Sequence, residues 1–62
     1  MASRKHYREA ADAFNREYND ATTDDARRLI ERLAREMGRV FAMEGGGFRM
    51  QSFMDAVTEP KK

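Results

Sequence analysis

Apolar side chains recur at helical spacing along two long stretches and one short stretch of this chain. In the longest, about residues 24–44, they stand at positions i, i+3, i+4 and i+7, the spacing of one face of an α-helix. The apolar positions are Ala26, Leu29, Ile30, Leu33, Met37, Val40 and Phe41. At about 100° per residue they fall on one side, so the pattern predicts a long amphipathic helix.

Two further apolar patterns flank this helix. The first covers about residues 3–19, and neither glycine nor proline interrupts it. Its apolar face consists of Tyr7, Ala10, Ala11, Phe14 and Tyr18. The other covers about residues 49–58, with Met50, Phe53, Met54 and Val57 on one face. Both patterns predict helices, and residues 59–62 are expected to form a frayed tail.

Residues with known capping preferences stand where these helices are expected to begin and end. Ser3 suits the N-cap of the first helix, and either Thr22 or Thr23 suits the N-cap of the second. Gly45–Gly47 should end the second helix, because glycine adopts left-handed backbone angles without steric cost. Phe48 then stands where its ring would fasten the start of the third helix to the core.

The sequence therefore predicts a single all-α domain over residues 1–62. Two main antiparallel helices, about 3–19 and 24–44, should pack together, and the short third helix should close their open side. The predicted core consists of Tyr7, Phe14, Leu29, Ile30, Leu33, Met37, Val40, Phe41, Phe48, Phe53 and Met54.

The small size of the domain favours self-association. A core of this size rarely supplies more than about 3–5 kcal/mol, and the chain has no cysteine with which to form a disulfide. Pairing of two chains would add buried apolar area, so we expect a homodimer formed through the second helix. Ala34 and Gly38, on the flank of its apolar stripe, would let another helix approach closely.

The composition of the chain does not favour an enzyme or a metal-binding protein. Without cysteine and with one histidine, His6, the chain offers no thiolate and no expected metal site, so we expect a protein that is not an enzyme and uses no cofactor. There is no apolar run of membrane-spanning length and no secretory signal pattern, which favours a cytoplasmic location. Basic and acidic residues, 12 and 11, nearly cancel to a net charge of +1, unlike a strongly basic nucleic-acid-binding protein.

A row of arginines on the second helix is the candidate binding face. It consists of Arg28, Arg32, Arg35 and Arg39, opposite the apolar stripe. We favour a solvated face with ion pairs along the helix, such as Glu31 with Arg35 and Arg32 with Glu36. The alternative is a footprint for phosphates or acidic protein, since arginine makes forked contacts. A helix-turn-helix motif over 33–38 fits poorly, because Arg39 stands where that motif needs an apolar residue.

Methionine is concentrated in the second half of the chain, at Met37, Met43, Met50 and Met54. Because methionine repacks easily, these residues would suit an adaptable protein-binding groove. The simpler interpretation, which we favour, is ordinary core filling in a small domain.

The segment from Phe41 to Ala56 and the opening Arg4-Lys5-His6-Tyr7 resemble small uncharacterised helical proteins of actinobacterial tailed phages and prophages. The matching positions are Phe41, Ala42, Phe48, Phe53 and Ala56, together with the Arg-Lys-x-Tyr opening. Glycines replace the usual loop, and Arg49 stands where those proteins carry a capping aspartate. The resemblance implies a phage origin and a helical fold, and it implies no activity.

These observations together favour a non-enzymatic phage accessory protein of the host-cell cytoplasm. Its expected role is that of a small helical protein–protein interaction module whose partner is an unidentified host or phage protein. The alternative is a small nucleic-acid-binding regulator that uses the arginines of the second helix.

Overall fold

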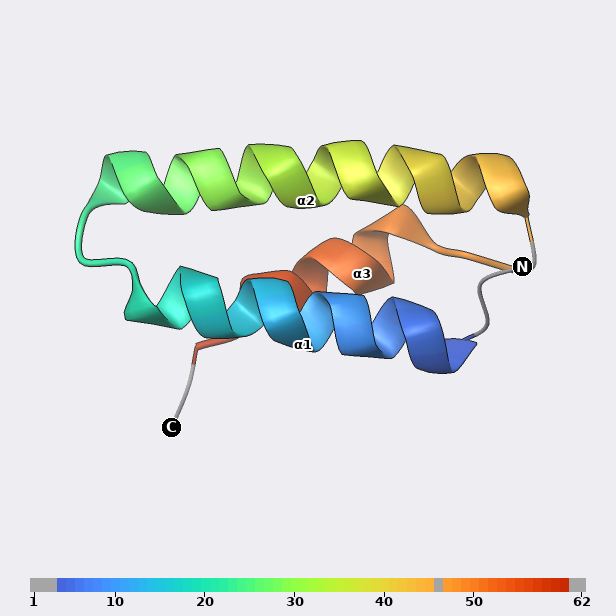
Figure 1. Ribbon diagram of the computed structural model, residues 1–62, viewed down its shortest axis with the longest axis horizontal. Coiled ribbons are helices and arrows are strands. Elements are labelled where there is room, and N and C mark those ends of the chain that lie inside the picture. Colours follow the sequence, from blue (N-terminus) through green and yellow to red (C-terminus); the bar gives the residue numbers. More distant parts are fainter. Residues whose placement is uncertain (1–3, 46, 61–62) are drawn as a thin grey trace.

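The computed structural model describes residues 4–45 and 47–60, and within them the chain forms three packed helices (Figure 1). They are α1 (Arg4–Asp20), α2 (Asp24–Glu44) and α3 (Met50–Val57). The two long helices run antiparallel beside each other, and α3 lies across both of them on one side (Figure 1). The predicted all-α fold of two long helices and a short third one is confirmed.

Local sequence explains where the helices end. Thr23, and not Thr22, caps α2, and its side-chain oxygen accepts a hydrogen bond from the Ala26 N–H at 3.1 Å. The glycines end α2 as expected: Gly45 has φ of 80°, and its N–H donates to the Ala42 carbonyl at 3.2 Å. The predicted cap Ser3 lies outside the described residues.

A cluster of aromatic rings holds the three helices together. The rings belong to Tyr7, Phe14, Phe41, Phe48 and Phe53. Tyr7 lies 4.9 Å from Phe41 and 5.0 Å from Phe48, between ring centroids, in tilted and edge-on arrangements. Such pairs contribute about 0.5–1.5 kcal/mol each beyond the burial of area. The Tyr7 hydroxyl also donates to the Gly45 carbonyl at 3.1 Å, which joins the start of α1 to the end of α2.

α3 approaches α2 closely at the smallest side chains of the long helix. Ala34 and Gly38 are both buried there. A Cβ atom added to Gly38 would lie 2.6 Å from the Sδ atom of Met50 and 3.4 Å from the ring of Phe48. The expectation that Ala34 and Gly38 would admit a helix from another chain is therefore wrong, because α3 and the segment before it fill that space.

The far end of α3 is fastened to α1 by asparagine side chains. The Asn15 amide donates to the carbonyl oxygens of Val57 at 2.9 Å and Glu59 at 2.8 Å, and Asn19 donates to Glu59 at 3.1 Å. The bond to Val57 satisfies a carbonyl that the last turn of α3 leaves without a partner, and the bonds to Glu59 fix the chain just beyond the helix. Glu59, expected in a frayed tail, is thereby tied to α1.

The predicted core was too wide on α2. Tyr7 and Phe53 are buried, and Phe14, Ile30, Phe41, Phe48 and Met54 are half-buried. The prediction is wrong for four residues of α2, which are 41–52% exposed and do not belong to the core: Leu29, Leu33, Met37 and Val40. The reason is geometric: α1 and α3 cover the side of α2 that carries Ala34, Gly38 and Phe41, and this side is rotated away from the centre of the apolar stripe.

Phe53→Ala should destabilise the domain by about 3–5 kcal/mol, because it leaves a cavity among the clustered rings. That loss is comparable with the total stability expected of so small a core, so most of the chain should be unfolded at 37 °C. Thermal unfolding followed by circular dichroism measures it.

Met43→Ala is the matched control, since the Met43 side chain is 87% exposed and lies outside the core. Its free energy of unfolding should stay within about 0.5 kcal/mol of the wild type. Equal losses for the two substitutions would contradict the placement of the core.

Candidate protein-interaction surface

α2 presents three different faces, separated by about a third of a turn. The inner face carries Ala34 and Gly38 and packs against α3. The second, here called the apolar face, consists of Leu29, Leu33, Met37 and Val40. The third, the arginine face, consists of Arg28, Arg32, Arg35 and Arg39. The exposed apolar face is not needed to hold the three helices together.

The apolar face is the surface whose exposure is hardest to explain in an isolated domain. Leu29 and Leu33 are each 52% exposed, Val40 is 51% exposed and Met37 is 41% exposed. Full burial of such a side chain is worth about 1.5–3 kcal/mol, so roughly half of that stabilisation is not realised at each position. Contiguous exposed apolar surface of this kind marks binding sites in soluble proteins.

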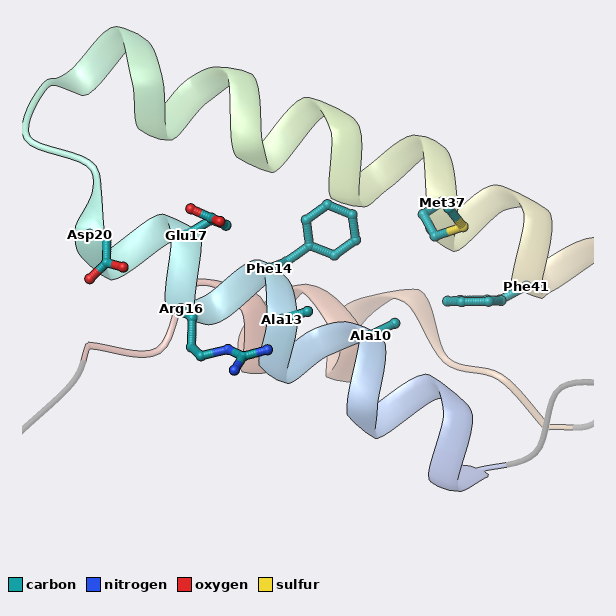
Figure 2. Close-up of a pocket in the computed structure, with 8 residues that line it drawn as sticks. All are labelled: Ala10, Ala13, Phe14, Arg16, Glu17, Asp20, Met37 and Phe41. Atoms are coloured by element: carbon teal, nitrogen blue, oxygen red, sulfur yellow. The ribbon is translucent and has the colours of Figure 1, made fainter.

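A groove continues this face towards α1. It has a volume of about 590 Å³ and is open to solvent. Its lining consists of Ala10, Ala13, Phe14, Arg16, Glu17, Asp20, Met37 and Phe41. Figure 2 shows Phe14, Met37 and Phe41 between the two long helices, with α3 behind them and Arg16 directed away. Because Met37 belongs to both, the groove and the apolar face form one continuous surface on the side opposite α3.

A second groove, between α1 and α3, differs in kind. Its volume is about 410 Å³, and its floor includes Tyr7, Ala11 and Phe53, which are already buried in the core. Arg8 and Arg49 stand at its edge. Its large apolar side chains are buried or, at Phe48, half-buried, so the more exposed α2 surface remains the better candidate.

The arginine face is partly neutralised by carboxylates of its own helix. Arg28 lies 3.9 Å from Asp25 and Arg39 lies 3.6 Å from Glu36, and all four side chains are largely exposed. These i, i+3 pairs differ from the expected pairs of Glu31 and Arg35 and of Arg32 and Glu36. Exposed pairs contribute about 0–1 kcal/mol, so they hold the face together only weakly.

Neither a metal-ligand cluster nor a membrane-spanning helix is found among the described residues. Among residues 4–45 and 47–60, no group of three or more His, Asp or Glu side chains is placed to hold a metal ion. None of the helices in that part of the chain is long and apolar enough to cross a membrane. The main feature of the described surface is the apolar face of α2, which lies between the arginine face and the groove.

Sequence reasoning found the residues of this surface but not their grouping. The small residues Ala34 and Gly38, four positions apart, are the sequence signal for the packed face, and the helix that they admit is α3 of the same chain. The contact of Arg27 with Tyr18 was missed: its guanidinium carbon lies 5.6 Å from the ring centroid and joins the start of α2 to the end of α1.

Leu33→Arg should leave the fold intact, because the side chain at this position already projects half into solvent. At low micromolar concentration we expect the helical circular dichroism signal and a cooperative thermal transition to be retained. Phe53→Arg, which buries a charge in the aromatic cluster, should abolish both. Loss of the fold in Leu33→Arg would show that the apolar face belongs to the core.

The comparisons with known proteins leave family and relatives open. No family model, no curated protein and no solved structure matches this chain. The resemblance to phage proteins therefore stays a prediction.

Proposed function

We propose that this chain is a non-enzymatic helical protein–protein interaction module, an accessory protein of a phage, and that it binds its partner through the apolar face of α2. The observation that carries the proposal is the exposure of Leu29, Leu33, Met37 and Val40 on one face of α2, since the other large apolar side chains of the described residues, Met43 apart, are buried or half-buried. A partner that covers these side chains would realise the burial that the isolated domain lacks.

The chemistry of the surface suits a helix as the bound element. The apolar face and the groove follow the long axis of α2, which at 21 residues is about 31 Å long. An amphipathic helix laid along such a strip presents apolar residues at i, i+3, i+4 and i+7. Met37 at the groove adds a side chain that adapts its shape to the partner.

The arginine face contributes to the choice of partner. It borders the apolar face along the same helix, so it would meet any side chains that flank the bound element. Carboxylates at those positions would be favoured and cations disfavoured, which affects specificity and the rate of encounter more than affinity. The partner is thus expected to be a protein chain that presents an apolar ridge to this surface.

Leu33→Arg should abolish capture of the partner. The affinity-tagged protein is incubated with lysate of the bacterial host, with and without phage infection, and bound proteins are compared by mass spectrometry. Ala42→Arg is the matched control: Ala42 is exposed on the same helix, nine positions further on and therefore about half a turn away from Leu33. A set of partners that both variants retain equally would contradict the proposal.

The second candidate function is a small nucleic-acid-binding regulator. The observation that favours it is that, within the described residues, the ion pairs of α2 involve Arg28 and Arg39 but not Arg32 or Arg35. Arg32 and Arg35 are exposed, and their guanidinium groups are suited to binding phosphate.

Titration of duplex DNA and of RNA at low and moderate salt separates the two functions. Under the proposed function we expect no micromolar binding at low salt. Micromolar binding that weakens steeply with salt, and that Arg32→Ala with Arg35→Ala removes, would favour the regulator instead.

A further inference from the structure

We propose that a second copy of this chain covers the apolar face of α2. The two α2 helices would pack antiparallel, with the two-fold axis passing the apolar face at the level of residue 35. The inference rests on the proposed function, since it names the protein chain that occupies the same surface. It differs from the expectation based on sequence, which placed the contact at Ala34 and Gly38.

The side of the molecule opposite α3 has the size that a stable dimer needs. The molecule measures 34 × 21 × 16 Å, and Figure 1 views it down the shortest axis, onto the side formed by the two long helices. This side extends over the two larger dimensions. Covering it with an identical surface would bury an area of the order of the roughly 800 Å² per partner of a standard interface. The isolated α2 strip would be too narrow, so the groove and α1 take part.

The apolar face is complementary to itself when the two helices run in opposite directions. With the two-fold axis at the level of residue 35 along the helix, Leu33 of one copy lies opposite Met37 of the other, and Ile30, a half-buried neighbour of the apolar face, lies opposite Val40. Each of these layers is apolar on both sides. A two-fold axis repeats every contact, so the same side chains are covered on both copies.

The small side chains of α1 leave room for such an approach. Ala10 and Ala13 line the α1 side of the groove, and Ala13 is exposed there. Two helices that meet at alanines approach each other more closely than helices that meet at large side chains. Stacking the two open sides therefore gives a four-helix layer between the two α3 helices.

Sedimentation equilibrium of the full chain tests the proposal. At tens to hundreds of micromolar, the wild type should have about twice the chain mass of 7.2 kDa, and its melting temperature should rise with concentration. Leu33→Arg and Val40→Arg should each weaken the dimer roughly 30-fold or more, because they place a charge at the centre of the contact on both copies. Ala42→Arg should leave the dissociation constant unchanged.

A mixing experiment tests the orientation. Leu33→Glu and Met37→Lys should each be monomeric when alone, since each places like charges near the axis. Mixed in equal amounts, they should form a heterodimer in which the introduced carboxylate of one variant faces the introduced ammonium group of the other. A mixture that remains monomeric would overturn the antiparallel arrangement.

Two results would overturn the dimer itself. One is a wild-type chain of monomer mass at hundreds of micromolar with a melting temperature independent of concentration. The other is a dimer that Leu33→Arg and Val40→Arg leave intact, which would place the contact elsewhere. A monomeric wild type that still captures a partner through Leu33 would leave the proposed function standing, and a monomer whose capture ignores Leu33 would remove both.

Discussion

The close approach of α3 to α2 at Ala34 and Gly38 is the constraint on which the rest of the structure depends. An added Cβ atom at Gly38 would meet the end of the Met50 side chain, so no larger residue fits there without displacement. This contact decides which side of α2 faces inward. It also brings Phe48 and Phe53 to the rings of Tyr7 and Phe41, where the aromatic cluster forms.

The stability of the domain and its surface follow from the same choice. With the small residues turned inward, the centre is filled by aromatic rings from α1, α2, α3 and the segment that leads into α3. The large aliphatic side chains of α2 are then turned towards solvent. A helix normally hides such residues first, because they gain most from burial. Their exposure is therefore the strongest link between this fold and a binding role.

The three faces of α2 have different surroundings. The inner face packs against α3, the apolar face carries the exposed side chains through which we propose binding, and the arginine face borders them with positive charge. Since the faces are about a third of a turn apart, a substitution on one leaves the other two unchanged. This separation lets the proposed binding be tested by substitutions that lie outside the core.

Local sequence was enough to predict the helices, their approximate ends and the aromatic rings of the core. Helical periodicity and local signals such as Thr23 and Gly45 are properties of neighbouring residues, so they need no tertiary information. Which part of the broad apolar stripe on α2 is buried depends instead on how α1 and α3 pack against it. Leu33 and Ala34 are adjacent in sequence, yet Ala34 is buried and Leu33 is half exposed, because α3 needs a close approach and packs where side chains are smallest. Periodicity identifies an apolar face, but the positions of the neighbouring helices determine how much of it they cover.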